Sequence, residues 1–164
     1  MTDNPLSGKR ILWVEDDYYA INGLFRPLML LGADVDVADC AMDGFKKLQR
    51  GAKYDLIVVD LILPLAMEDG KLPDKVSEWM HLEYVGIGLA RWMLDECKVT
   101  CPVVVLSVVR HPNSRYDLKD LGIAKFLYKP YLTPLALRDE LLPLLQPTTP
   151  PPGEASSVST AGMA

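Results

Sequence analysis

The sequence lacks the features that mark several large classes of protein. No apolar run approaches the roughly 20 residues of a membrane-spanning helix, and the N-terminus has neither the charged nor the apolar region of a signal peptide. A net charge of −5 without any basic stripe argues against direct binding of nucleic acid. The three cysteines include no C-x-x-C pair, so neither a disulfide framework nor a zinc site is indicated. We expect a cytoplasmic protein that binds neither membranes nor nucleic acid directly.

The chain is long enough for one domain, and its composition changes near the C-terminus. It has 164 residues, of which 49% are apolar, which is ample for a buried core. From residue 147 onward it consists mainly of proline, threonine, serine, glycine and alanine. We predict a single domain over residues 1–146 and a disordered tail or linker over 147–164. Whether the domain acts alone or is a piece of a longer protein stays open.

Short apolar runs alternate along the chain with longer amphipathic segments, which is the pattern of βαβ units. The predicted strands are 10–14, 34–38, 56–60, 103–106 and 125–128. The predicted helices are 17–31, 42–50, 85–97, 113–121 and one that starts after Thr133 and ends before Pro143. The alternation predicts a doubly wound parallel α/β sheet of order 2-1-3-4-5, whose switch point lies between the first and third strands.

Acidic residues gather where two of these strands end. Glu15, Asp16 and Asp17 follow the first strand directly, and Asp60 closes the third. The carboxyl ends of neighbouring parallel strands meet at one edge of the sheet, where ligands bind. Carboxylates this close repel one another, so a cation must hold them together. A hard, oxygen-seeking Mg²⁺ is the natural candidate.

The other central strands also end on polar side chains. Ser107 ends the fourth strand, and Lys129, followed by proline, ends the fifth. With these residues in place, the sequence resembles the receiver domain of two-component response regulators. The matching pieces are residues 11–17, 55–64, 103–107 and 126–130, and the resemblance covers about residues 8–146. It implies a flavodoxin-like (βα)5 sandwich, in agreement with the alternation of elements.

The resemblance also implies a function and its residues. Asp60 would accept a phosphoryl group from a histidine kinase or a histidine phosphotransfer protein. Asp16, Asp60 and the backbone carbonyl of Ile62 would hold Mg²⁺, with Glu15 acting through a metal-bound water. Lys129 would pair with the phosphoryl charge.

Two further residues would carry the switch. Ser107 would donate its hydroxyl once the phosphoryl group is present, and Phe126 would then change rotamer. The resemblance implies a cis bond between Lys129 and Pro130, although cis is the minority state for any X–Pro bond. The domain would be a phosphoacceptor with only self-phosphorylation and slow self-dephosphorylation, rather than an enzyme in its own right. Its downstream partner and any homodimerisation stay open.

The chain departs from the family pattern after Asp60. The interval from Asp60 to Ser107 is 47 positions, longer than expected by roughly 15–20 residues. The extra material is about residues 65–84, called the insert below. Because Trp79, Met80 and Leu82 are apolar, one hypothesis is an ordered flap beside the site that restricts which partner approaches. The alternative is a passive surface excursion.

The neighbours of the site are apolar as well. Val108 follows Ser107, and Ile62 and Val109 occupy positions that influence how water reaches an acyl phosphate in the family. We therefore expect a dry site and slow self-hydrolysis.

Three other functions compete with a phosphorylated receiver. A receiver-like interaction module that is not phosphorylated would use the insert as its interface. An aspartate-nucleophile phosphatase would need a carboxylate at Ile62, and a flavin phosphate would be repelled by the acidic residues after the first strand. Taken singly, the acidic residues are ordinary helix caps and Lys129 an ordinary strand end, so the phosphoacceptor hypothesis depends on their conjunction.

Overall fold

A computed structural model describes residues 4–67, 71–110 and 118–146 of the chain. Its centre is a five-stranded parallel sheet of order β2-β1-β3-β4-β5. The strands are β1 (Arg10–Val14), β2 (Asp34–Ala38), β3 (Leu56–Val59), β4 (Val103–Ser107) and β5 (Lys125–Tyr128). This is the predicted order, and the predicted flavodoxin-like fold class is therefore confirmed.

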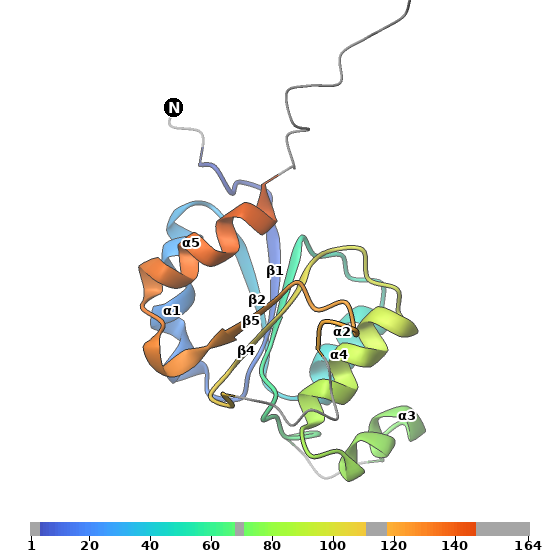
Figure 1. Ribbon diagram of the computed structural model, residues 1–164. Coiled ribbons are helices and arrows are strands. Elements are labelled where there is room, and N and C mark those ends of the chain that lie inside the picture. Colours follow the sequence, from blue (N-terminus) through green and yellow to red (C-terminus); the bar gives the residue numbers. More distant parts are fainter. Residues whose placement is uncertain (1–3, 68–70, 111–117, 147–164) are drawn as a thin grey trace, which may run out of the picture.

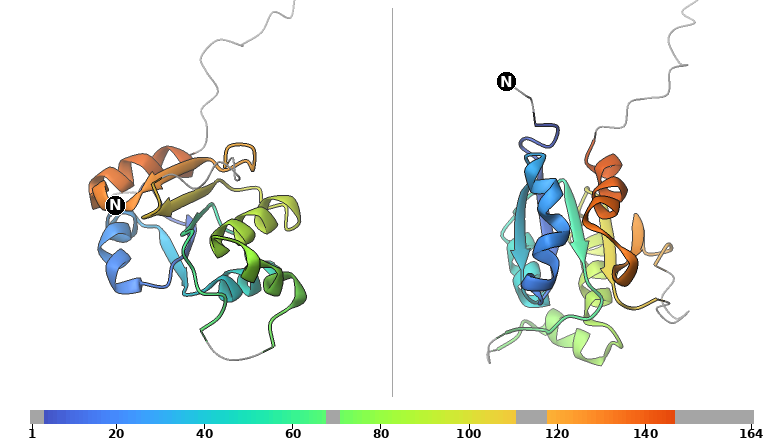
Figure 2. Two further views of the ribbon diagram at one scale, coloured as in Figure 1. Left: turned by 60° about the horizontal axis from the view of Figure 1, so that its bottom comes forward. Right: turned by 90° about the vertical axis from the view of Figure 1, so that its left-hand side faces the viewer.

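Helices cover both faces of the sheet (Figures 1 and 2). They are α1 (Tyr18–Leu30), α2 (Ala41–Gln49), α3 (Asp74–Ser77), η1 (Glu78–His81), α4 (Val85–Asp95), η2 (Lys129–Tyr131) and α5 (Pro134–Leu145). Helices α1 and α5 lie side by side on one face, and α2 and α4 lie on the other. None of the helices among the described residues is long and apolar enough to cross a membrane.

The apolar strands are explained by burial on both faces. In β1, Ile11 and Trp13 pack toward α1 and α5, whereas Leu12 and Val14 pack toward α2 and α4. All four side chains are at most 1% exposed. Side chains of a strand alternate between faces, so a central parallel strand needs apolar residues at every position.

The helix ends agree with the local chemistry of the sequence. Asp17 caps α1, since its Oδ1 accepts a hydrogen bond from the amide of Ala20 at 3.0 Å. Thr133 caps α5 in the same way, with Oγ1 accepting from the amide of Ala136 at 3.2 Å. Each cap satisfies an amide that has no partner inside its helix.

Three local expectations were wrong. Helix α5 continues through Pro143 to Leu145, because Pro143 lies on the exposed face while Leu141 and Leu145 remain buried. A carbonyl left without its helical donor on that face can bond to water. The bond between Lys129 and Pro130 is trans. Residues 118–122 form a turn rather than the end of a helix, and the remainder of the helix expected at 113–121 lies outside the described residues.

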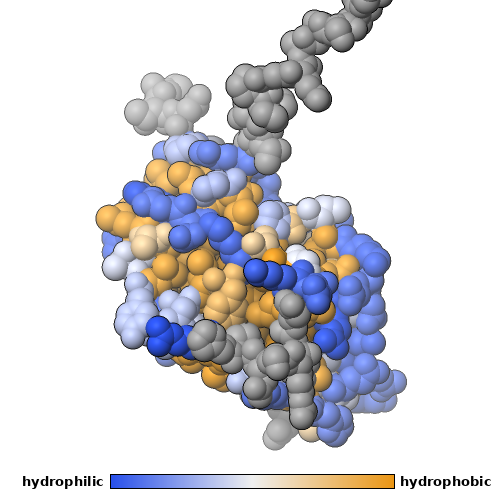
Figure 3. Space-filling model, viewed as in Figure 1, coloured by the Kyte–Doolittle hydropathy of each residue, from blue (hydrophilic) through white to orange (hydrophobic). Residues whose placement is uncertain are grey.

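The described residues of the insert, 65–67 and 71–84, contribute to the core. It contains α3 and η1, and Val76 is fully buried while Trp79 is only 4% exposed. The indole of Trp79 meets the ring of Phe45 on α2 edge-on, with the ring centroids 6.1 Å apart. The surface of the molecule where α3 lies is mostly hydrophilic (Figures 1 and 3). Val76 and Trp79 of the insert are therefore part of the core on the α2 and α4 face of the sheet.

Candidate functional site

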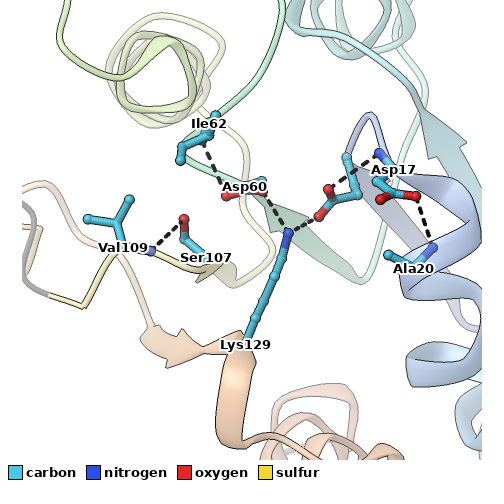
Figure 4. A network of polar contacts seen from close by, with 8 residues as sticks. Asp17, Ala20, Asp60, Ile62, Ser107, Val109 and Lys129 are labelled. Carbon is cyan, nitrogen blue, oxygen red and sulfur yellow. Dashed lines mark hydrogen bonds and ion pairs between the residues drawn. The ribbon is translucent and has the colours of Figure 1, made fainter.

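Three of the predicted site residues meet at the switch point of the sheet. The side chain of Lys129 extends from the end of β5 to Asp60 at the end of β3, with Nζ 2.6 Å from Oδ2 (Figure 4). The same ammonium donates a hydrogen bond to Oε2 of Glu15, which follows β1. The carboxylates are deeply buried, Glu15 being 3% and Asp60 5% exposed. One cation thus compensates two buried anions, as such anions require.

Burial and neighbouring charges shift the pKa values of this cluster in opposite directions. Burial raises the pKa of Glu15 to about 7, and the hydrogen bond and charge of Lys129 only partly oppose the rise. Burial also disfavours the charge of Lys129, but the hydrogen bonds that its ammonium donates to Asp60 and Glu15 outweigh this effect and raise its pKa. Lys129 therefore stays charged at every physiological pH, while Glu15 titrates near neutrality.

The raised pKa of Glu15 predicts that stability falls as the pH rises. Between its unfolded value of 4.5 and its folded value of about 7, the folded protein binds a proton that the unfolded chain does not. The gain is present below pH 4.5, is lost progressively up to about pH 7, and is on the order of 3 kcal/mol in full. Urea unfolding at pH 5, 6 and 7.5 measures it. Glu15→Gln should remove this step, and Asp16→Asn, at an exposed neighbour, should keep it. An unchanged profile in Glu15→Gln would contradict the assignment.

The cluster lies at the bottom of an open cleft of about 400 Å³. Asp16 and Ile62, both predicted to bind metal, line the cleft, as do Val108 and Pro130. No described residue of the insert is part of the lining. The described residues of the insert therefore form no part of the cleft, and the role of the insert in restricting partners stays a prediction.

Sequence reasoning missed one wall of the cleft. Ala20, Ile21 and Leu24 of α1 line it together with Asp17. Their spacing of three, four and seven residues from the N-cap places them on one face of the helix. That spacing was available from the sequence once α1 had been placed beside the site.

The cleft contains carboxylate oxygens of the kind that bind Mg²⁺. Within the described residues, no three histidine, cysteine or acidic side chains converge as a ready-made metal site. Mg²⁺ retains several waters and commonly takes only one or two carboxylates from the protein. Asp16 and Asp60 line one cleft and supply that number of hard oxygen donors. The residues therefore fit Mg²⁺, with Glu15 already engaged by Lys129.

The two predicted switch residues lie outside the charged cluster. Ser107 is fully buried, and its hydroxyl accepts a hydrogen bond from the amide of Val109 at 3.4 Å (Figure 4). Phe126 is half-buried and packs on the cluster formed by Leu61, Ile87, Val105 and Leu118. Neither residue lines the cleft, so their predicted roles require a change that follows ligand binding.

No family model matches the sequence, and no curated protein matches it. Solved structures do match. The chemotaxis response regulator CheY4 of Vibrio cholerae is 19% identical with a TM-score of 0.62, covering 84% of this chain and 98% of its own. A two-component response regulator from Clostridium difficile is 23% identical, with a TM-score of 0.61 and coverage of 84% and 95%.

A third match is a complex with ligands. It is the response regulator protein TrrA from Thermotoga maritima in complex with Mg²⁺ and BeF, 22% identical with a TM-score of 0.59, covering 84% of this chain and 99% of its own. The chain has the receiver-domain fold. At these identities the likeness establishes the fold alone, so the function has to be argued from the site.

Proposed function

We propose that this domain is a response-regulator receiver that accepts a phosphoryl group on Asp60. The observation that carries the proposal is the contact between Lys129 and Asp60, made across two strand ends in a cleft that Asp16 also lines. A buried lysine paired to two carboxylates serves stability poorly, since apolar residues in place of all three would avoid the cost of desolvation. Its place at the switch point of the sheet favours a ligand-binding role.

The side chains present divide the work of phosphoryl transfer. An Oδ atom of Asp60 attacks the phosphorus of a phosphohistidine, the P–N bond breaks, and its electron pair stays on the imidazole nitrogen, which takes up a proton. Lys129 stabilises the negative charge on the phosphoryl oxygens. The amide of Ile62 donates to Oδ1 of Asp60 at 3.2 Å and so orients the nucleophile.

A Mg²⁺ ion bound by Asp16, Asp60 and the carbonyl of Ile62 would neutralise charge on the phosphoryl oxygens. Glu15 would orient a water of that ion. Once the acyl phosphate exists, the Ser107 hydroxyl would exchange its long bond to Val109 for a phosphoryl oxygen. Because that contact exists only in the phosphorylated state, it shifts the conformational equilibrium and, with it, the rotamer of Phe126.

The cleft also indicates the kind of partner that delivers the phosphoryl group. Around the charged cluster its walls are largely apolar, formed by Ala20, Ile21, Leu24, Val108 and Pro130. An apolar rim around a charged centre fits a helix that presents a phosphohistidine among apolar residues. A histidine kinase or a histidine phosphotransfer protein supplies such a helix, and we propose one of these as the donor.

Phosphorylation by a small donor tests the proposal directly. With acetyl phosphate and Mg²⁺, the protein should gain the mass of one phosphoryl group, mapped by peptide mass spectrometry to Asp60. Asp60→Asn should gain none, and Asp139→Asn, at an exposed site on α5, should behave as the wild type. Labelling of Asp60→Asn at the wild-type rate would refute the assignment.

Beryllofluoride separates the proposal from an interaction module that is not phosphorylated. It mimics the acyl phosphate in the presence of Mg²⁺, as in the complex of TrrA. A phosphoacceptor should show amide chemical-shift changes at Ser107 and Phe126, which lie on different strands from Asp60. A module that has lost phosphorylation should show none.

The acyl phosphate is expected to last for minutes or longer. Ile62 and Val108 both line the cleft with apolar side chains. Neither side chain can hold a water molecule in position to attack the acyl phosphate. Val109, the other residue expected to act here, does not line the cleft. Decay of the phosphorylated protein after removal of the donor measures the lifetime. Ile62→Asn should shorten it, and decay within seconds in the wild type would contradict the prediction.

A further inference from the structure

Helix α4 contacts both the insert and the backbone around Asp60. The first turn of α4 lies directly on the backbone that follows β3, residues 60–64, called the acceptor loop below. The amide of Gly86 donates to the carbonyl of Leu61 at 3.0 Å. A Cβ at Gly86 would overlap the carbonyl oxygen of Asp60 and lie 2.8 Å from Cα of Leu61. The position of the acceptor loop is therefore tied to the position of this helical turn.

The same turn of α4 also contacts the insert. A Cβ at Gly88 would lie 2.5 Å from Cγ of Trp79 and 2.8 Å from Cδ1 of Leu82. Both of these residues belong to the insert, and Trp79 is buried. Because neither glycine has a side chain, α4 contacts the acceptor loop directly at Gly86 and the insert directly at Gly88.

The other end of the acceptor loop is also held next to the insert. The carbonyls of Pro64 and Leu65 accept hydrogen bonds from the first amides of α2, those of Ala41 and Met42, at 3.0 and 2.8 Å. Helix α2 presents Phe45 to the indole of Trp79. The side chain of Trp79 therefore contacts both of the helices that hold the acceptor loop.

We propose that Trp79 is a positioning residue, through which the insert sets the distance between α2 and α4 and so the placement of Asp60 against Lys129. The inference deepens the proposed phosphoacceptor function and rests on it. An error of about 1 Å in the placement of reacting groups is sufficient to slow a reaction up to about 100-fold. A purely structural insert would affect stability but not the rate in the folded protein.

Phosphorylation rates in folded variants test this proposal. Trp79→Ala should lower the maximal rate of phosphorylation by acetyl phosphate about 10-fold, at a temperature where circular dichroism shows that the variant is folded. Trp79→Phe keeps an aromatic ring on Gly88 and should recover most of the rate. Trp92→Ala is the matched control, because Trp92 stacks on the same Phe45 at 4.5 Å one turn beyond Gly88. It should lose stability but stay within about twofold of the wild-type rate.

A double-mutant cycle shows whether the effect passes through Gly88. Gly88→Ala alone should slow phosphorylation, since its Cβ meets the indole. In the background of Trp79→Ala the added methyl enters the space that the indole leaves, so Gly88→Ala should cost nothing further or restore rate.

The outcomes separate this inference from the proposed function. If the wild type is not phosphorylated, the proposed function fails. If the wild type is phosphorylated and folded Trp79→Ala reacts at the same rate, or Trp92→Ala slows the reaction equally, the positioning role of Trp79 is wrong while the phosphoacceptor remains. Should Trp79→Ala not fold, Trp79→Phe and Gly88→Ala decide by the same comparison of rates.

Discussion

Lys129→Met is expected to abolish measurable phosphorylation of Asp60 and to cost about 3 kcal/mol or more of stability at neutral pH. The ammonium contacts both Asp60 and Glu15, and both carboxylates are almost completely buried. Removing the ammonium leaves two buried carboxyl groups without the cation that they contact. It also removes the group that would stabilise the phosphoryl charge, which is worth about 100- to 1,000-fold in rate for comparable donors. Urea unfolding and labelling with acetyl phosphate measure the two effects.

The loss of stability in Lys129→Met should depend on pH. Without the ammonium, the folded-state pKa of Glu15 rises further above its unfolded value, because burial and the charge of Asp60 both favour the protonated form. The gap in stability between the variant and the wild type should therefore widen as the pH rises above about 7, where Glu15 of the wild type has lost its proton and Glu15 of the variant has not. Adding Asp60→Asn should recover part of the lost stability, since one buried charge disappears.

Lys125→Met is the control for loss of a lysine from β5, the strand that Lys129 directly follows. Lys125 pairs with Glu140 on α5, and both side chains are more than a third exposed. An exposed pair of this kind contributes about 0–1 kcal/mol, so the variant should keep the wild-type pH profile. Equal losses in the two lysine variants would show that Lys129 is an ordinary surface residue.

The sheet and the charged cluster were predictable for the same physical reason. Strands buried on both faces appear in the sequence as uninterrupted apolar runs, as in β3 (Leu56–Val59) and β4 (Val103–Ser107). The residue that follows such a run lies at the carboxyl edge of the sheet. Asp60 and Lys129 were therefore placed at one edge by counting alone, although their hydrogen bond was not implied by the sequence.

The insert was less predictable because its packing is non-local. Trp79, Met80 and Leu82 showed that the segment was not wholly disordered, but nothing in the sequence indicated that Trp79 would be buried while Met80 is 60% exposed. The indole fits where α4 has no side chain at Gly88. A contact that depends on the absence of an atom elsewhere in the chain leaves no periodicity to find.

The remaining differences come from local rules that yielded to tertiary structure. Proline is strongly unfavourable in helix interiors, yet α5 continues past Pro143 because the last turn of the helix buries Leu145. Ser107 was expected at the site, but its hydroxyl is fully buried on the amide of Val109. The sequence identifies the hydroxyl at the strand end but does not indicate which partner it takes before a phosphoryl group arrives.

Gly86→Ala is expected to destabilise the protein by about 3 kcal/mol, at the upper end of overpacking penalties. Alanine is the better helix former by about 1 kcal/mol, so local propensity predicts the opposite sign. The loss is expected because the new Cβ would overlap the carbonyl oxygen of Asp60, and backbone on both sides leaves no flexible group to yield. The first turn of α4 must therefore move away from the acceptor loop, which also breaks the bond from the Gly86 amide to Leu61.

Gly23→Ala provides a control of opposite sign. Gly23 lies within α1 on its exposed side, and a Cβ there would meet nothing within 4 Å. Alanine should stabilise the protein at this position by about 0.5–1 kcal/mol. Urea unfolding of both variants measures the contrast, and labelling with acetyl phosphate at a permissive temperature shows whether displacement of α4 also slows reaction at Asp60. If both substitutions stabilise the protein, then α4 does not press on the acceptor loop, and its route to Asp60 is lost.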